Sequence, residues 1–460
     1  MRALLNGSLL GAALLTGCGT IPAKAPPELS VPAAFKEAAP PAAAAAPVQP
    51  DGRWWQVFHS LELDSLIAEA TQANASLAVA AARVRQARAV AGIADADRSV
   101  QVGAQAGVQR GVTPPGLAAT NWQAGLTASY ELDLFRRIGA ASKAAEADAQ
   151  AQQASYGALM LVLQADVAQT WFRLRATDAE LRSLERTAQL WEEHVSVTQR
   201  RYELGDIGEF DLVRARTELA GARADAIGLQ NQRAQFEHGL AVLLGRPAAS
   251  FGAPARPLEA DLVLPRIPAG LPSSLLERRP DIGAAQRALE AAQARIGVAR
   301  SSLLPSLTLG GGGAGVGGTV GELFGGAGRS WLFDAVLAMP LFDGGRRQAG
   351  IARSEAVYDE AAATWRLQVL QAFAEVEDNV AGLRILARQS AQVDSALQSA
   401  QRAADLAQQL YRGGRSSYLD LLDARRNLAR VERNAVQLRG SRAVATVALI
   451  RALGGGWDAS

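Results

Sequence analysis

The sequence is poor in the side chains on which most enzymes and metal sites depend. Its 460 residues include one cysteine and three histidines. The histidines, His59, His194 and His238, are scattered along the chain, so we predict neither a metal cluster nor a His-based catalytic site. A lipid-anchored enzyme is a remote alternative, because the sequence has no clustered nucleophile, base or metal site. We therefore expect no catalytic residues, no cofactor and no metal.

Aromatic residues and an excess of charge of either sign are also scarce. Aromatics make up 5% of the chain, whereas hydrophobic residues make up 49%, and the excess is mostly alanine, which suits closely packed helices. The 47 basic and 45 acidic residues give a net charge of +2. Because no strongly basic patch stands out, we predict that nucleic acid is not a partner.

A long hydrophobic run is missing as well. The apolar run Ala3–Leu15 is too short to cross a bilayer as a helix, and small residues follow it, so residues 1–17 are predicted to be a secretory signal peptide. Leu15, Thr16, Gly17 and Cys18 resemble a bacterial lipobox, which implies cleavage before Cys18 and a covalent lipid on it. Gly19 follows in place of the aspartate that commonly retains lipoproteins in the inner membrane, so we expect the outer membrane. The alternative is a chance cysteine beside an ordinary signal.

Two proline-rich stretches divide the rest of the chain. Residues 18–50 are predicted to form the lipid anchor and an extended tether rich in proline and alanine. Residues 246–279 are predicted to link two halves, a first repeat at 51–245 and a second at 280–460.

The two halves are repeats of one another. A displacement of 209 residues pairs Tyr202 and Gly205 with Tyr411 and Gly414, and it persists over about 100 residues. Earlier in each half the displacement is 205, which pairs Leu77 with Ile282 and Ala94 with Ala299. A four-residue difference in length must therefore lie between these regions.

Each half is predicted to run helix, two strands, very long helix, turn, helix. In the first half the helices cover Asn74–Arg98, Gly139–Glu203 and Gly208–Gly245, and apolar residues at three-four spacing form a seam along the long one. At 1.5 Å per residue these helices would be roughly 38, 95 and 57 Å long. Since the short pair together match the long one, we expect them to stack end to end beside it.

The segments between the helices alternate with period two. Even positions from Trp122 to Leu134 are apolar, and the residues between them are mostly polar. The partner of this segment is Val100 to Val108, and a second pair is Leu303–Leu309 with Trp331–Leu341. Such one-sided segments are typical of outer-membrane barrel strands. A soluble hairpin packed on a core is the alternative on periodicity alone.

Four strands cannot close a transmembrane barrel, and an open edge in lipid leaves backbone groups without partners. The chain must therefore oligomerise, and two to four copies would each give a closable barrel.

The chain resembles the TolC-like outer-membrane factors, most closely their lipidated NodT-type branch. The resemblance rests on three strings that carry family motifs, Trp54-Trp55 to Asn74, Gly270 to Ile282, and Pro340 to Arg346. It implies an α+β membrane protein: a trimeric twelve-stranded β-barrel, four strands per chain, continued by a long α-helical periplasmic barrel. The partners it implies are two further copies, outer-membrane lipids, a periplasmic adaptor and an inner-membrane pump, with the resistance-nodulation-division type favoured.

The resemblance also implies functional positions near the helix tips. Gly205, Gly208, Gly413 and Gly414 are the expected adaptor-contact tips, where glycine permits sharp reversals. The expected gate is Leu419, Asp420 and Asp423, whose carboxylates would form rings that attract cations. A solvated helix face is the alternative for the two aspartates. Asp211 and Tyr411 match a pair whose hydrogen bond latches the closed state, although Ser416, beside Arg415, replaces the arginine that helps this latch in the best-known member.

These observations together predict an export channel subunit of a tripartite efflux or secretion system, a passive conduit gated at its periplasmic tips. The rival is a periplasmic coiled-coil adaptor or scaffold lipoprotein, which would not need one-sided strands. The glycine-rich stretch 313–318 fits a dinucleotide-binding pattern but precedes no helical pattern, so we expect a flexible extracellular loop there.

Overall fold

The computed structural model describes residues 30–37, 52–113, 116–259, 262–265, 267 and 272–455. The predicted signal peptide, Cys18 and most of the predicted tether lie outside these ranges. The chain divides into two compact units, which are described separately. Unit 1 contains Ala81–Ser155 and Asp281–Gln368, and unit 2 contains Ser30–Ala80, Tyr156–Pro280 and Val369–Ser460.

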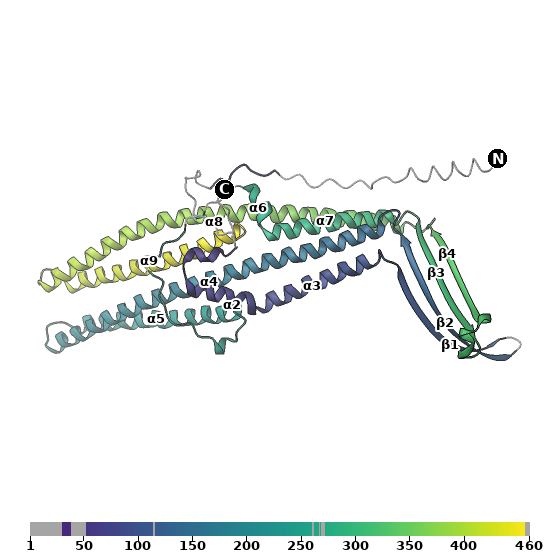
Figure 1. The fold of residues 1–460 in the computed structure, drawn as a ribbon. Helices are drawn as coiled ribbons and strands as arrows, with labels where there is room; N and C mark the ends of the chain where they lie inside the picture. The colour runs from purple at the N-terminus through teal and green to yellow at the C-terminus, as the bar shows by residue number, and fades with distance from the viewer. Residues whose placement is uncertain are drawn as a thin grey trace. The chain divides into compact units, whose positions relative to one another are not determined.

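The predicted order of elements is confirmed in both halves (Figure 1). The first half consists of η1 (Trp54–Phe58), α2 (Leu61–Ala73), α3 (Ala75–Ala96), β1 (Gln101–Thr113), β2 (Leu117–Leu132), α4 (Arg137–Glu203) and α5 (Glu209–Leu243). The second consists of η2 (Ala248–Ser250), α6 (Pro272–Arg278), α7 (Pro280–Ser301), β3 (Ser306–Gly317), η3 (Val320–Phe324), η4 (Gly326–Gly328), β4 (Arg329–Ala338), α8 (Arg346–Arg412) and α9 (Tyr418–Ala452). No helix in the described part of the chain has the length and apolar character needed to cross a membrane.

The repeat is visible in the element boundaries. Helices α4 and α8 both have 67 residues and begin 209 positions apart, and α5 and α9 both have 35. Helices α3 and α7 both have 22 residues and begin 205 positions apart. Equivalent strand pairs also match, since Arg110 faces Thr120 in one hairpin and Gly315 faces Arg329 in the other. The four extra residues therefore lie in the β3–β4 connection, where η3 and η4 form.

Helix α6 is the counterpart of α2, so the second repeat begins before the predicted boundary at residue 280. In each half, the residue between the first two short helices donates a hydrogen bond to the last turn of the helix that ends the half. The Asn74 amide donates to the Leu243 carbonyl at 2.9 Å, and the Arg279 guanidinium donates to the Ala452 carbonyl at 3.0 Å. Because Leu243 ends α5 and Ala452 ends α9, the short helices meet end to end at these points, as the length argument predicted.

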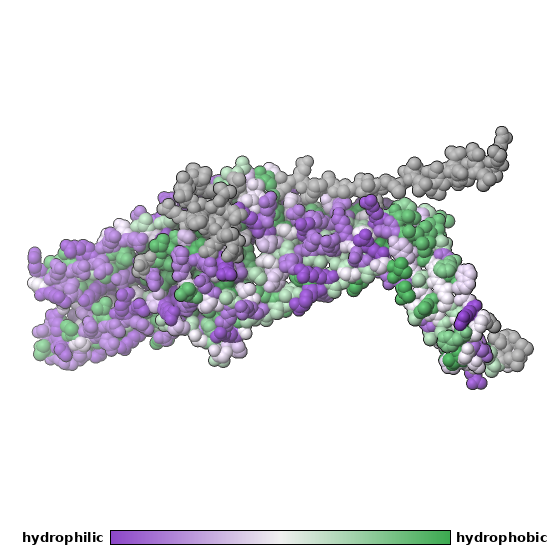
Figure 2. Space-filling model, in the orientation of Figure 1, coloured by the Kyte–Doolittle hydropathy of each residue, from purple (hydrophilic) through white to green (hydrophobic). Residues whose placement is uncertain are grey.

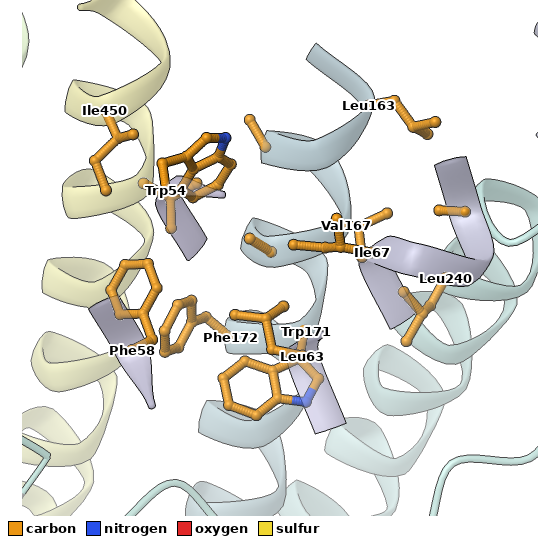
Figure 3. Packing of buried hydrophobic residues seen from close by; sticks show 14 of the residues in the cluster. Trp54, Phe58, Leu63, Ile67, Leu163, Val167, Trp171, Phe172, Leu240 and Ile450 are labelled. Carbon is orange, nitrogen blue, oxygen red and sulfur yellow. The ribbon is translucent and has the colours of Figure 1, made fainter. Parts of the chain in front are cut away.

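The main core of unit 2 forms where η1 and α2 pack on α4 (Figure 3). Leu63, Ile67 and Phe172 have no exposed surface, and the Phe58 ring meets the Phe172 ring edge-on. The Trp54 indole donates to the Gln164 side chain at 3.2 Å, which satisfies the polar atom of a buried aromatic. The apolar residues near the start of the first repeat thus anchor it to the long helix.

A buried ion network joins α4 to α5 and to the segment after η2. The Asp178 carboxylate, 1% exposed, accepts from Arg175 at 3.1 Å and from Arg233 at 2.7 Å. Both arginines also donate to backbone carbonyls, Arg175 to Pro254 at 2.7 Å and Arg233 to Ala253 at 2.6 Å. Arg175 pairs with Glu62 of α2 as well. Buried charges need such partners, so the network fixes these segments together.

The described part of the predicted tether contacts the body of unit 2. Residues 30–37 form no regular helix, as expected from their proline, yet Phe35 is buried against Phe373 of α8. The backbone N–H groups of Lys36 and Glu37 donate to the Glu377 carboxylate at 2.7 and 2.9 Å. This stretch is therefore fixed to α8.

In unit 1 the strands form one antiparallel sheet in the order β1-β2-β3-β4. The register places Val102 opposite Ala128, Ala104 opposite Leu126, and Val108 opposite Trp122, so the apolar positions share one face. On β4, Trp331 and Phe333 continue this face, with ring centroids 5.8 Å apart. Figure 2 shows hydrophobic residues in green on the sheet. The predicted alternation is confirmed on β1 and β2. Strand β3 instead begins at Ser306 and runs to Gly317, beyond the predicted Leu303–Leu309, and β4 ends at Ala338 and also carries Leu332 and Val336 on the opposite face.

The glycine-rich stretch is strand and not the predicted loop, because residues 313–317 belong to β3. Its glycines make room for close neighbours. A Cβ atom at Gly311 would lie 2.8 Å from the Phe333 ring, and one at Gly315 would collide with the Leu323 carbonyl of η3. Since side chains would be excluded at these positions, the composition that resembled a loop instead permits tight cross-strand packing.

Candidate functional site

Both long hairpins of unit 2 reverse through the same hydrogen-bonded turn. Gly205 follows α4 with φ of +77°, and Gly414 follows α8 with φ of +63°. Such a left-handed residue ends many helices and suits glycine. In each turn, two backbone N–H groups donate back to carbonyls of the preceding helix. In the first turn these bonds are Asp206 N–H to Arg201 O at 2.9 Å and Gly205 N–H to Tyr202 O at 3.0 Å. In the second they are Arg415 N–H to Leu410 O at 2.8 Å and Gly414 N–H to Tyr411 O at 3.0 Å.

The two turns differ in how the next helix begins. Gly208 is the N-cap of α5 and has no side chain to offer, whereas Ser417 is the N-cap of α9. The Asp420 amide donates to the Ser417 hydroxyl at 3.3 Å, and the Ser417 amide donates back to the Asp420 carboxylate at 3.0 Å. This capping box gives Asp420 a structural role in holding the first turn of α9. Gly413, the other predicted tip residue, lies in the second turn.

The remaining predicted gate residues are exposed, as Asp420 is. Leu419 is 41% exposed, and the Asp423 side chain is 71% exposed. Among the described residues, the Asp423 carboxylate pairs with Arg426 at 3.8 Å, and Arg426 is also paired with Glu218 of α5. Exposed pairs of this length are weak. Asp423 therefore keeps a carboxylate available at the tip.

Within this chain the predicted bond between Asp211 and Tyr411 does not form in the described residues. The Tyr411 hydroxyl accepts from the Arg201 guanidinium at 2.6 Å instead. Arg201 lies in the last turn of α4, so its long side chain reaches the tyrosine at the end of α8. In the part of the chain that the structure describes, the buried hydroxyl of Ser416 has no hydrogen-bond partner. One link between the two hairpins thus uses Arg201, which the sequence had not indicated, and the pair of Arg426 with Glu218 is another.

An aromatic cluster beside the second tip was also not predicted. The His194 imidazole of α4 stacks on the Tyr418 ring of α9, with centroids 4.3 Å apart, and Trp191 meets it edge-on at 6.0 Å. Burial, and secondarily the charge of Arg425, lowers the pKa of His194 from 6.5 to about 4. The cluster therefore holds a neutral histidine next to the gate turn.

In unit 1, strands β1 and β4 are the edges of the sheet, and each pairs with one neighbour. The apolar face is exposed, with Val102 at 72%, Leu126 at 61% and Trp331 at 78%. An exposed apolar face with two open edges requires lipid on that face and further strands at both edges. Together with helices of 67 residues, these features define a membrane-embedded channel subunit.

The comparisons with known proteins agree. The sequence matches the family described as Outer membrane efflux protein over residues 66–246 and 271–455, and the chain belongs to this family. It is 35% identical over 434 residues to the pyoverdine export outer membrane protein OpmQ of Pseudomonas putida, covering 91% of each chain. It is 32% identical over 449 residues to the cation efflux system protein CusC of Escherichia coli O6:H1, covering 96% and 97%.

Solved structures give the same result. The open state of the Neisseria gonorrhoeae MtrE outer membrane channel matches with a TM-score of 0.84 and 28% identity, over 95% of this chain and 98% of that one. The outer-membrane channel OprN matches with a TM-score of 0.87 and 28% identity, over 95% and 99%. The predicted family, α+β fold class and efflux-channel function are thereby confirmed, and the scaffold alternative is not supported.

The family is a channel family and not an enzyme family, and its members are outer-membrane components of efflux systems. Lipidation of Cys18 and the roles of the individual gate, latch and tip residues stay predictions. Among the described residues, no three histidine, cysteine, aspartate or glutamate side chains are placed to hold a metal ion.

Proposed function

We propose that three copies of this chain form the outer-membrane exit duct of a tripartite efflux system, anchored by a lipid on Cys18 and gated at the helix tips. The observation that carries this proposal is the sheet, whose apolar face is exposed and whose strands β1 and β4 each have a free edge. Three four-stranded sheets joined β1 to β4 close a twelve-stranded barrel without an unpaired edge.

The gate in this proposal is formed by Leu419 and Asp423. Leu419 supplies an apolar ring and Asp423 a ring of carboxylates, because both side chains are exposed at the start of α9. Asp420 supports the gate by capping α9. The hydrogen bond from Arg201 to Tyr411 ties the two hairpins of a chain together and serves as the closed-state latch. Asp211 joins this latch in the assembled channel. The open state reported for MtrE supports a gate in a related channel.

The partners follow from the position of the channel. A periplasmic adaptor is proposed to contact the tips at Gly205, Gly208, Gly413 and Gly414, and an inner-membrane pump of the resistance-nodulation-division type supplies the energy. A periplasmic path from lipid anchor to channel body is supported by residues 30–37, which are fixed to α8 through Phe35 and Glu377.

The deciding experiment is native mass spectrometry of the detergent-extracted, mature protein, combined with planar-bilayer recordings of the same sample. We expect a trimer with a lipid on its N-terminal peptide and a conductance that rises when Arg201→Gln breaks the latch. Arg216→Gln, which removes a bond between α4 and α5 away from Tyr411, is the matched control. A stable monomer that does not conduct would overturn the proposal.

A further inference from the structure

The lipid-facing side of the sheet carries two arginines near the end remote from the helices. On β1, Arg110 follows Ala104, Ala106 and Val108 at the alternate positions of the apolar face. On β4, Arg329 precedes Trp331 and Phe333 on the same face. The helices join the sheet at its other end, through Gln101, Leu132, Ser306 and Ala338. Both arginines are therefore at the extracellular margin of the apolar band.

The height of this band places the arginines at the level of lipid headgroups. From Arg329 to Leu337, strand β4 runs about 26 Å at 3.3 Å per residue, which a tilt of about 40° reduces to roughly 20 Å. That is close to the apolar band of about 25 Å in outer-membrane barrels. A charge at this margin meets the headgroups of the outer leaflet, whereas a charge at mid-depth would be costly.

The short helix η3 completes a cationic and apolar surface there. It folds onto the apolar face of β3, because a Cβ atom at Gly315 or Gly317 would collide with it. The Arg329 guanidinium donates to the Phe324 carbonyl at 2.8 Å, while the Phe324 ring is 72% exposed. The acidic residue of η3, Glu322, accepts from the Gly318 amide at 2.8 Å. Among the described residues, neither arginine forms an ion pair.

We propose that Arg110 and Arg329 bind a phosphate of an outer-leaflet glycolipid at each junction between copies. This inference rests on the proposed trimer, in which β1 of one copy pairs with β4 of the next. The two arginines then belong to adjoining strands of neighbouring copies. Guanidinium groups form paired hydrogen bonds to phosphate, and Phe324 contacts the acyl chains beside it.

The test counts lipid A molecules retained by the full-length channel in native mass spectrometry. The trimer is mixed with lipid A carrying both phosphates or with the dephosphorylated lipid. We expect wild type to retain the phosphorylated lipid and to bind the dephosphorylated one about tenfold more weakly. R110Q and R329Q should each show the same loss, whereas R353Q, an exposed arginine on α8, should match wild type.

Several outcomes would overturn the inference. One is that R110Q and R329Q retain as much phosphorylated lipid as wild type does. Another is that the phosphorylated and dephosphorylated lipids bind equally well. If the losses of lipid binding in R110Q and R329Q simply added in the double variant, the two arginines would not share one site. If R329Q fails to assemble, R110Q decides: a trimer that binds the phosphorylated lipid about tenfold more weakly supports the inference, and one that matches wild type contradicts it. Failure of wild type to form any trimer would instead remove the proposed function itself.

Discussion

At the residue scale, Asp420 and Asp423 lie three positions apart on α9 but use their carboxylates differently. We expect Asp423→Ala to reduce the cation preference of the open channel, because it removes an exposed ring of charge. Asp420→Ala should instead cost about 1 kcal/mol of stability through loss of the cap. Reversal potentials in a salt gradient and thermal unfolding curves separate the two effects. An unchanged reversal potential in Asp423→Ala would remove this residue from the gate.

His194 makes the second tip sensitive to acid. Its pKa is about 4 in the folded chain and near 6.5 when unfolded, so the unfolded state binds more protons between these values. Stability should therefore fall as the pH drops from about 6.5 to about 4, below which the loss levels off. Urea unfolding at pH 7.5 and pH 5 measures the loss. His194→Phe keeps a ring against Tyr418 but does not titrate, and an equal loss in that variant would contradict the assignment.

The sequence could place Leu419, Asp420 and Asp423 through the family motif, but it could not rank them. The signal for the role of Asp420 was present, because serine followed three residues later by an acid is a capping pattern. No comparable local signal exists for Arg201 or His194. Their partners, Tyr411 and Tyr418, lie over 200 residues away in sequence, so these contacts depend on how the hairpins pack.

At the element scale, the buried network around Asp178 holds α4, α5 and the segment after η2 together. We expect Asp178→Ala to destabilise the protein by about 3–5 kcal/mol, because Arg175 and Arg233 would lose their buried partner. The control is Asp225→Ala, whose side chain is 57% exposed in its pair with Arg433, and which should cost less than about 1 kcal/mol. Thermal unfolding of both variants decides, and similar losses would contradict the role of the network.

The long helices and the strand faces were predictable because their periodicity extends over many residues. Boundaries of α4 and α5 fall within two residues of those predicted. The short elements α2, α6 and η3 were not predicted as separate elements. Each is stabilised mainly by tertiary contacts, such as those of Leu63 and Ile67 with α4. The glycines of β3 were wrongly predicted to form a loop for the same reason, because their suitability for a strand depends on tertiary contacts with Phe333 and η3.

At the scale of the whole molecule, the two faces of the sheet should respond oppositely to charge. Ala104 is on the apolar face of β1, opposite Leu126, and Gln105 is on the other face. Arginine at position 104 should cost about 2–4 kcal/mol per chain on the lipid side. Arginine at position 105 should be tolerated, because that side borders the water-filled lumen. The yield of trimer on native gels measures the difference, and equal yields would contradict the assignment of faces.

Oligomerisation followed from counting strands, but the number of copies did not. The edges β1 and β4 show that the sheet must continue, and two, three or four copies satisfy that requirement equally. Only the likeness to known channels selects three. The difficulty is physical, because copy number depends on sheet curvature and on contacts between chains, which no single chain contains.

The N-caps of the two hairpins differ, and this difference lowers the symmetry of the surface that a docking protein would contact. The turns at Gly205 and Gly414 are alike, but α9 begins with the Ser417–Asp420 box and α5 begins at Gly208 without one. In the proposed trimer the periplasmic ring would therefore alternate firm and loosely held tips. A partner built from six identical subunits would face two kinds of binding surface, so its members would bind in alternating strong and weak positions around the ring.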